Sequence, residues 1–294
     1  MNPLELVRLP DLMKRGQGCP EVAIALIDGS VARDHPDLAS ASIREIPGKL
    51  KGTCVRADTV ACTHGTFVAG MFAARRDSAA PAICPACTLL LRPIFAEAVN
   101  GNGHMPSATP EELAEAIVDS VNAGAKVINL SAALVQPSSK GESRLEQALD
   151  YAAQRGTITV AAAGNQGAVG SSVITRHPWV IPVAACDLTA RPLGESNLGS
   201  SIGRGGLRAP GEGVTSLGPD GKPQTLGGTS AAAPFVTGAI ALLWSEFPEA
   251  TPAEVKLAIT RQGRQPHKAL VPPLLDASAA YEVMASARRR EIVQ

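Results

Sequence analysis

Residues 109–131 read TPEELAEAIVDSVNAGAKVINLS, and this stretch joins a helical pattern directly to a strand pattern. Apolar residues recur at helical spacing through its first part, which opens with Thr109, Pro110 and Glu112 and closes on a glycine. A threonine cap, a first-turn proline and an early acid are typical of a helix start, and a glycine is typical of the residue after a helix end. The following KVINLS (126–131) is short and apolar, as a strand buried on both faces would be. The stretch therefore predicts a helix that leads into a buried parallel strand.

The same alternation of strand and helix patterns continues on both sides of this stretch. Further strand-like runs lie at 22–27, 88–94, 157–163 and 179–185, and a second helical run that closes on a glycine spans 143–156. Strand–helix–strand repetition predicts right-handed crossovers and a doubly wound, mostly parallel α/β sheet with helices on both faces. No internal repeat or convincing linker interrupts the pattern. We therefore expect one domain over 1–294, with an N-terminal extension at 1–20 and a C-terminal tail and helix at 265–294.

The charge balance argues against two classes of partner. The 27 basic and 27 acidic residues sum to a net charge of zero, so no general electrostatic attraction to nucleic acid or to an anionic membrane is expected. No apolar run reaches the roughly 18 residues that a membrane-spanning helix needs. A membrane span is therefore not expected either.

The N-terminal sequence and the cysteines give an expectation about the cellular compartment in which the protein works. The early apolar run at 22–27 lies well inside the chain and is better read as a strand than as a secretory signal, so a cytoplasmic protein is expected. The six cysteines stand at positions 19, 54, 62, 84, 87 and 186. In the cytoplasm they would be reduced, with a disulfide as the alternative. Cys84 and Cys87 form a lone CPAC, which is a weak metal or redox signal without a second pair. We expect neither a metal nor a cofactor.

Four polar residues stand where predicted strands end or predicted helices begin. Asp28 and Asn165 directly follow predicted strands, whereas His64 and Ser230 open helical runs. Functional groups in a doubly wound sheet gather at its carboxyl edge, so all four are expected there. Taken singly, such an aspartate is often a helix cap, and a lone histidine is more often a packing residue. Their joint occurrence in these contexts favours a catalytic group.

The four residue types fit the roles that acyl transfer requires. Ser230 would attack a carbonyl carbon, His64 would take the hydroxyl proton, and Asp28 would orient the imidazole and stabilise its charged form. The backbone N–H of Ser230 and the side-chain amide of Asn165 would donate hydrogen bonds to the tetrahedral oxyanion. The interpretation is therefore a serine nucleophile with its base, orienting acid and oxyanion hole.

The sequence around these residues resembles that of the subtilisin-like serine peptidases, the subtilases. The similar blocks are GTFVAG after His64, AAAGN ending at Asn165, APGEGV (209–214) and GGTSAAAPFVTG around Ser230. The resemblance implies the subtilisin-like α/β fold, a triad that includes Asp28, and hydrolysis of peptide bonds through an acyl-enzyme.

The resemblance also implies a set of substrate-binding residues. VNGNGHMPSATPEELAEAI (99–117) and VINLSAAL (127–134) are similar to the segments that line the family's substrate cleft. The residues implied are Gly101, Asn102, Gly103, His104, Leu130, Ser131, Ala132, Ala133, Ala162, Ala163 and Gly164. Ala132 and Ala133 stand where the family commonly has glycines, so we expect a narrowed primary pocket that favours small or unbranched side chains.

Within the family, this chain is similar to the cyanobactin-type subtilases. The short lead-in before Asp28, the LIDGSV block and CPACTLLLRPIFAE (84–97) carry that similarity. Such proteins process ribosomally made precursor peptides inside the producing cell, some by removing a leader and others by macrocyclisation. The macrocyclising members carry a helical insertion between the aspartate and histidine blocks, and only 35 residues lie between Asp28 and His64. The resemblance therefore favours leader removal by hydrolysis.

Two other functions stay open. A less specialised member of the family would degrade protein inside the cell, and a non-catalytic relative would only bind peptides. In all three cases the partner is a peptide or protein chain.

Overall fold

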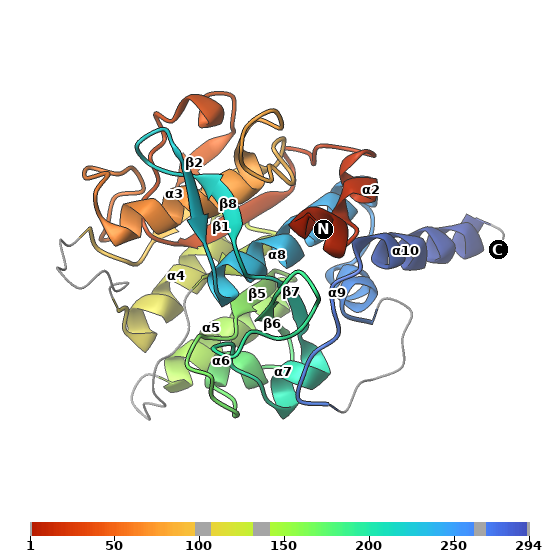
Figure 1. Cartoon of the computed structure of the whole chain (residues 1–294). Coiled ribbons are helices and arrows are strands. Elements are labelled where there is room, and N and C mark those ends of the chain that lie inside the picture. The colour runs from red at the N-terminus through yellow and green to blue at the C-terminus, as the bar shows by residue number, and fades with distance from the viewer. Residues whose placement is uncertain (1, 98–106, 132–141, 262–268, 293–294) are drawn as a thin grey trace.

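The protein is built around one parallel sheet (Figure 1). The computed structural model describes residues 2–97, 107–131, 142–261 and 269–292. Seven strands pair in parallel in the order β2-β3-β1-β4-β5-β6-β7. They are β1 (Ala23–Asp28), β2 (Ile43–Glu45), β3 (Thr88–Pro93), β4 (Val127–Leu130), β5 (Ile158–Ala162), β6 (Val180–Cys186) and β7 (Leu207–Pro210). An antiparallel hairpin of β8 (Val214–Leu217) and β9 (Pro223–Leu226) stands apart from this sheet.

Helices cover both faces of the sheet. They are α1 (Pro3–Leu6), α2 (Leu9–Met13), α3 (Val60–Ala73), α4 (Pro110–Asn122), α5 (Glu142–Gln154), α6 (Val173–Arg176), α7 (Ser200–Gly205), α8 (Thr229–Glu246), α9 (Pro252–Arg261) and α10 (Ala277–Ile292), with a short 3₁₀ helix at Pro36–Leu38. Side chains of β1 alternate between two cores: Leu26 belongs to the core that holds α3 and α8, whereas Ile27 belongs to the core that holds α4 and α5. The doubly wound α/β sheet predicted from the sequence is confirmed.

The register of the strands lines up their carboxyl ends. Asp28 pairs with Pro93, Ile27 pairs with Leu130, and Leu130 in turn pairs with Ala161. Because all these strands run in parallel, the residues that follow them emerge along the same edge of the sheet. This edge carries the candidate site.

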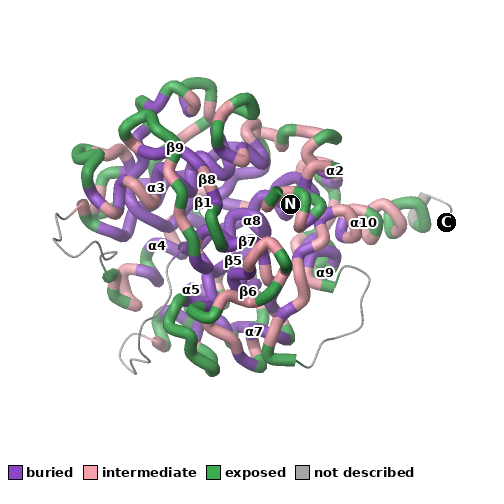
Figure 2. The backbone as a smooth tube through the Cα atoms, in the orientation of Figure 1, coloured by how far each residue is buried: buried purple, intermediate pink, exposed green. Residues whose placement is uncertain are grey.

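The helix α8 is the most deeply buried helix of the fold (Figure 2). It packs against β4, β5, β6 and β7 as well as against α3 and α9. Its sequence is apolar on every side, from Ala231 through Trp244, as expected for a helix without a solvent face. Small residues such as Ala239 and Gly238 let neighbouring elements approach closely. The serine of interest stands at the start of this helix.

The two ends of the chain pack against each other (Figure 1). The helix α10 contacts α2 and α9, and the amide of Ala277 donates to the carbonyl of Val7. The guanidinium of Arg15 lies over the ring of Tyr281, 4.0 Å from its centroid. The N-terminal extension and the C-terminal helix expected from the sequence therefore form one packed unit beside α8.

The sequence located the long elements to within a few residues. The helix predicted at 109–124 is α4, and the hydroxyl of Thr109 caps it together with Glu112 in a reciprocal capping box. The sequence pattern missed β2, β7 and the β8–β9 hairpin, none of which exceeds four residues. Each of these short strands contains polar residues, so none shows the mainly apolar run that revealed β4, and each is too short to show a period of two.

Candidate active site

The end of β1 and the helix α3 bring an aspartate and a histidine together. Asp28 is the last residue of β1 and is fully buried. The hydroxyl of Thr59 caps α3, which begins at Val60, so His64 lies in the second turn and not at the helix start that the sequence suggested. A Cβ on Gly29 would lie 2.0 Å from the carbonyl oxygen of Ala61, so only glycine permits this approach of helix to strand.

His64 lies between Asp28 and Ser230 and contacts both. Its Nδ1 is 2.7 Å from Oδ1 of Asp28, and its Nε2 is 2.9 Å from Oγ of Ser230. The side chain of His64 is 12% exposed. With Nδ1–H donating to the carboxylate, Nε2 is left to accept the serine proton.

The electrostatics favour the protonated imidazole. Burial by itself lowers the pKa of His64, but the charge of Asp28 and its hydrogen bond outweigh burial, so the pKa is raised above its ordinary value. Asp28 also accepts a 2.6 Å hydrogen bond from the backbone N–H of Gly29, which fixes the carboxylate against the histidine. The arrangement can take up a proton at Nε2 and stabilise the resulting positive charge.

The start of α8 presents Ser230 and connects it to Asn165. Gly228, at the cap of this helix, has a φ of +85°. A side chain there would be strained, and its Cβ would lie within 3.1 Å of the Asn165 amide. Oδ1 of Asn165 accepts from the backbone N–H and the hydroxyl of Thr229, at 2.9 and 3.0 Å. Because both bonds are accepted by Oδ1, the amide nitrogen Nδ2 of Asn165 is left to donate to a bound ligand.

Thr229 is a site residue that the sequence reading missed. Its hydroxyl donates to Asn165 and accepts from the backbone N–H of Gly164 at 3.1 Å. It thereby fixes the turn after β5 to the helix that carries Ser230. Nothing in the sequence pattern distinguishes this threonine from an ordinary helix cap.

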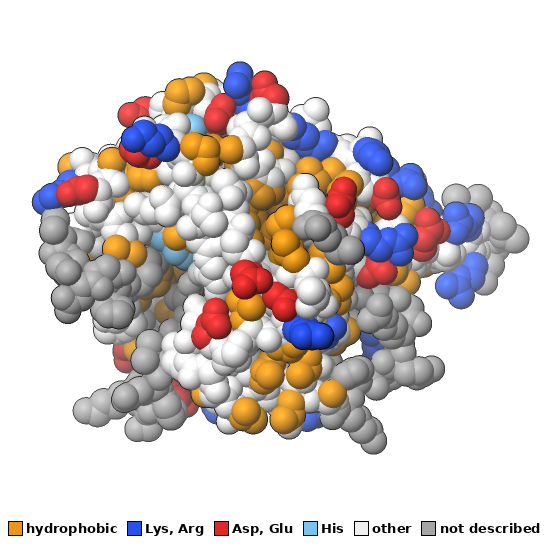
Figure 3. Space-filling view, viewed as in Figure 1, with side chains coloured by type: hydrophobic (Ala, Val, Ile, Leu, Met, Phe, Trp, Pro, Cys, Tyr) orange, Lys and Arg blue, Asp and Glu red, His pale blue; other side chains and the backbone are white. Residues whose placement is uncertain are grey.

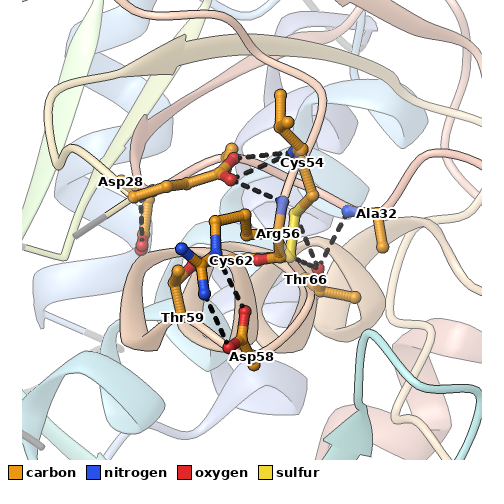
Figure 4. Close-up of a disulfide and its surroundings, with 12 residues drawn as sticks. Asp28, Ala32, Cys54, Arg56, Asp58, Thr59, Cys62 and Thr66 are labelled. Atoms are coloured by element: carbon orange, nitrogen blue, oxygen red, sulfur yellow. Dashed lines mark hydrogen bonds and ion pairs between the residues drawn. A yellow bond between two sulfur atoms is a disulfide. The ribbon is translucent and has the colours of Figure 1, made fainter. Parts of the chain in front are cut away.

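A disulfide lies beside this group (Figure 4). It joins Cys54 to Cys62, two residues before His64, and the hydroxyl of Thr66 lies 3.9 and 4.0 Å from the two sulfur atoms. For this pair the structure shows the disulfide that the sequence analysis kept as the alternative to reduced thiols. The residues are eight positions apart, and the sequence contains no sign that the segment folds back onto the start of α3.

The segment next to the disulfide is held by a carboxylate. Glu97 accepts from the backbone N–H of Val55 at 3.0 Å, from that of Arg56 at 2.7 Å and from the hydroxyl of Ser30 at 2.5 Å. Because Ser30 lies two residues after Asp28, this network connects the disulfide segment to the end of β1. Val55 is 78% exposed beside it.

The other four cysteines are free thiols, as expected. Cys84 and Cys87, the pair in CPAC, are both buried. A hydrogen bond with Cys87, together with burial, raises the pKa of the Cys84 thiol well above its ordinary value. Burial likewise raises the pKa of Cys186 to about 11. The hydrogen bond with Cys84 instead lowers the pKa of the Cys87 thiol. Buried thiols with raised pKa values, such as those of Cys84 and Cys186, are poor nucleophiles.

Two of the substrate-binding residues expected from the sequence lie at a cavity of about 260 Å³. Ala162 and Ala163, at the end of β5, line it. Leu130 and Ser131 are buried at the end of β4, and Ser131 accepts a hydrogen bond from Asn129. Gly164 lies between the cavity wall and Asn165.

The remaining predicted substrate-binding residues are Gly101, Asn102, Gly103, His104, Ala132 and Ala133, which lie outside the described residues. The cavity also contains two charged residues that the sequence reading missed. They are Glu142 and Arg176, 34 positions apart in the chain, which no local pattern connects.

The surface and the helices agree with the balanced composition. On the face shown in Figure 3, basic and acidic side chains are interspersed and no broad field of one sign appears. Among the described helices, none combines the length and the apolar character that crossing a bilayer requires. Within the same described ranges, no three His, Cys, Asp or Glu side chains are grouped as metal ligands.

Comparison with known proteins identifies similar chains. The model of the subtilase family matches residues 20–272. Subtilisin DY of Bacillus licheniformis is 31% identical over 257 residues, which cover 86% of this chain and 87% of that protein. The structure of the prenylagaramide maturation protease PagA covers 94% of this chain and 98% of its own, with 28% identity and a TM-score of 0.80. The structure of the patellamide maturation protease PatA covers 92% of this chain and 98% of its own, with 30% identity and a TM-score of 0.77.

Proposed function

Because the chain belongs to the subtilase family of serine peptidases, we propose that Ser230, His64 and Asp28 are the residues with which it cleaves peptide bonds. The observation that carries the proposal is the unbroken sequence of contacts from Asp28 through His64 to Ser230, at 2.7 and 2.9 Å. These distances lie in the range over which a base takes a proton from a nucleophile.

In the proposed mechanism, His64 removes the hydroxyl proton as Oγ of Ser230 attacks the scissile carbonyl. Asp28 stabilises the imidazolium that forms. The negative charge on the carbonyl oxygen is met by Nδ2 of Asn165 and by the backbone N–H of Ser230 at the start of α8, where the helix dipole favours an anion. His64 then protonates the leaving amine, and a water molecule hydrolyses the acyl-enzyme by the same steps.

The test is replacement of the two reacting residues. Ser230→Ala and His64→Ala are each expected to lower kcat by a factor on the order of 10⁶, the loss known for a subtilisin. Ser245→Ala is the matched control, because Ser245 lies at the other end of the same helix, where its hydroxyl donates to the carbonyl of Ala241. A fluorophosphonate probe should label the wild type and Ser245→Ala but not Ser230→Ala. Labelling that persists in Ser230→Ala would overturn the assignment, and a folded wild type that takes no label would indicate a binding module.

The proposed substrate is a ribosomally made precursor peptide from which the enzyme removes a leader. PagA and PatA, to which this chain is 28% and 30% identical, are both maturation proteases, and this similarity supports the proposal. The genes beside the one for this chain supply the candidate substrate. Incubation with that peptide should give cleavage at one position, whereas denatured casein should be cut poorly. Rapid cutting of casein at many positions would instead favour general protein degradation.

The proposal includes a cytoplasmic location, where precursor peptides are made. The Cys54–Cys62 disulfide makes this location testable, because thiols in the cytoplasm are kept largely reduced. Because Cys62 is fully buried in the folded protein, the producing cells are quenched with acid and the protein is denatured before alkylation, which should modify both cysteines if the enzyme works in the cytoplasm. Protection of both from alkylation would place the enzyme in an oxidising compartment.

A further inference from the structure

The turn that follows Asp28 packs directly against the helix that carries His64. A Cβ on Gly65 would lie 2.3 Å from the carbonyl oxygen of Ser30 and 2.6 Å from that of Gly29, so the turn and the helix are in backbone contact. Because the turn continues directly from Asp28, its position determines how the carboxylate meets the imidazole of His64.

Residues 52–56, which we call the Cys54 segment, pair with this turn. The backbone N–H of Val31 donates to the carbonyl of Gly52 at 2.8 Å, and the N–H of Cys54 donates to the carbonyl of Val31 at 3.0 Å. The disulfide to Cys62 then fixes the segment to the first turn of α3 (Figure 4). The Cys54 segment therefore connects the turn after Asp28 to the helix that carries His64.

The carboxylate of Glu97 is a second constraint on the same segment. Its Oε1 accepts from the hydroxyl of Ser30 at 2.5 Å, and its Oε2 accepts from the backbone N–H of Arg56 at 2.7 Å. Both oxygens lie 3.0 Å from the backbone nitrogen of Val55. Hydrogen bonds to an ionised carboxylate are stronger than those between neutral groups. Val55 and Arg56 are exposed, so these bonds hold a part of the segment that burial does not.

The two constraints differ in their response to a reducing compartment. Two molecules of a thiol such as glutathione would convert the Cys54–Cys62 bond to two cysteine thiols and would leave as one glutathione disulfide. The hydrogen bonds of the Glu97 carboxylate involve no electron transfer, so reduction leaves them in place. In the proposed cytoplasmic location, Glu97 would be the constraint that remains.

We propose that Glu97 is a positioning residue for the triad, which keeps the Cys54 segment on the turn after Asp28 when the disulfide is reduced. The proposal rests on the peptidase function proposed above. Either constraint alone limits the movement of the segment, because the disulfide holds residue 54 and the carboxylate holds its neighbours 55 and 56. With both removed, this largely exposed backbone opens locally, and the turn no longer holds Asp28 in place against His64.

The experiment combines Glu97→Ala with Cys54→Ala/Cys62→Ala and compares the two variants, their combination and the wild type. Each change alone is expected to lower kcat by about twofold, whereas the combination should lower it by at least about thirtyfold, because the two constraints act on one segment and their losses do not add. KM should change little. The rate at which a fluorophosphonate labels Ser230 should fall in the same proportion, since labelling needs the activated serine and no peptide.

The conservative variant Glu97→Gln distinguishes the hydrogen bonds from the mere presence of a side chain. Its amide oxygen can accept from the backbone N–H groups of Val55 and Arg56, while its amide nitrogen donates to the hydroxyl of Ser30. In the background without the disulfide, Glu97→Gln should therefore recover most of the kcat that Glu97→Ala loses.

Glu254→Ala is the matched control. The carboxylate of Glu254 likewise accepts from a backbone N–H and a hydroxyl, both of Thr251 at 2.7 Å, but it does so at the start of α9. Combined with Cys54→Ala/Cys62→Ala, it should lower kcat no further than the cysteine changes alone.

The outcomes separate this inference from the proposed function. If the losses of the two changes simply multiply, or if Glu97→Gln recovers nothing, the inference is wrong and the peptidase function stands. An effect confined to KM, with unchanged labelling, would also overturn it, because Glu97 would then shape peptide binding. A folded wild type that takes no label would mean that the proposed function itself has failed. If circular dichroism shows that the combined variant does not fold, Glu97→Ala is titrated with a phosphine instead. Its labelling rate must then fall as the two thiols are released, and a constant rate would contradict the inference.

Discussion

At the scale of single residues, hydrogen bonds from neighbouring groups position the catalytic side chains. Asn165 is positioned by Thr229 and not by its own turn alone, since both bonds to its Oδ1 come from that threonine. Asp28 is positioned by the N–H of Gly29 as well as by His64. The sequence reading named the triad, including Asp28 as the residue that orients His64, whereas the roles of Thr229 and of the Gly29 N–H become visible only in the structure.

Asn165→Ala is expected to lower kcat by a factor on the order of 10² to 10³ with little change in KM, because the side-chain amide of Asn165 would donate to the substrate oxygen mainly in the transition state. Thr229→Val should also lower kcat, because Oδ1 of Asn165 then loses its hydrogen bond from the Thr229 hydroxyl and keeps only the one from the backbone N–H. Thr229→Ser keeps the hydroxyl and serves as the control that retains activity. Steady-state kinetics on one peptide decide the matter, and an effect confined to KM would make Asn165 a ground-state binding residue.

The pH dependence of cleavage follows from the raised pKa of His64. Only neutral imidazole can accept the serine proton, so activity is lost as the pH falls through the pKa of His64. Because that pKa lies above its ordinary 6.5, the acidic limb of kcat/KM should have its midpoint above 6.5. Asp28→Asn removes the charge that raises the pKa, so its residual activity should show a midpoint at lower pH. A wild-type midpoint below 6.5 would contradict this assignment.

At the scale of elements, the disulfide fixes the segment before α3 to the start of that helix. Closing so short a loop is worth about 2–3 kcal/mol in the free energy of unfolding. Reduction with a phosphine should therefore lower the Tm of the wild type by several degrees. The double variant Cys54→Ala/Cys62→Ala should have a low Tm that the reductant does not change further. Equal shifts in both proteins would show that the reductant lowers the Tm by an effect other than cleavage of this disulfide.

The elements also show how far a sequence can be read. Strands β1 and β4 and helix α4 were predictable because each is either continuously apolar or clearly periodic and capped. The positions of Asp28 and Ser230 followed, since the edge of a parallel sheet is a property of topology. The Cys54–Cys62 bond and the Glu142–Arg176 pair were not predictable, because each depends on how two segments pack and not on either segment alone.

At the scale of the whole molecule, we propose that the chain acts as one peptidase domain. Its ends meet beside α8, where α2 contacts both α8 and α10. The sheet carries the site at one edge, and the paired ends stabilise the helix from which Ser230 emerges.

The burial of α8 from Ala231 to Trp244 has a consequence for the rate at which the enzyme digests itself. The helix that carries Ser230 is also packed against four strands of the sheet, so any opening large enough to expose the core displaces the nucleophile. A molecule that has opened enough to be cleaved has therefore lost its active site. Autolysis then requires an intact molecule to cut an opened one. Self-digestion should then be second order: the initial rate of activity loss should rise with the square of the protein concentration. This order holds while opening and closing are fast relative to cleavage; under those conditions a rate merely proportional to concentration would contradict the expectation and indicate that each molecule cuts itself.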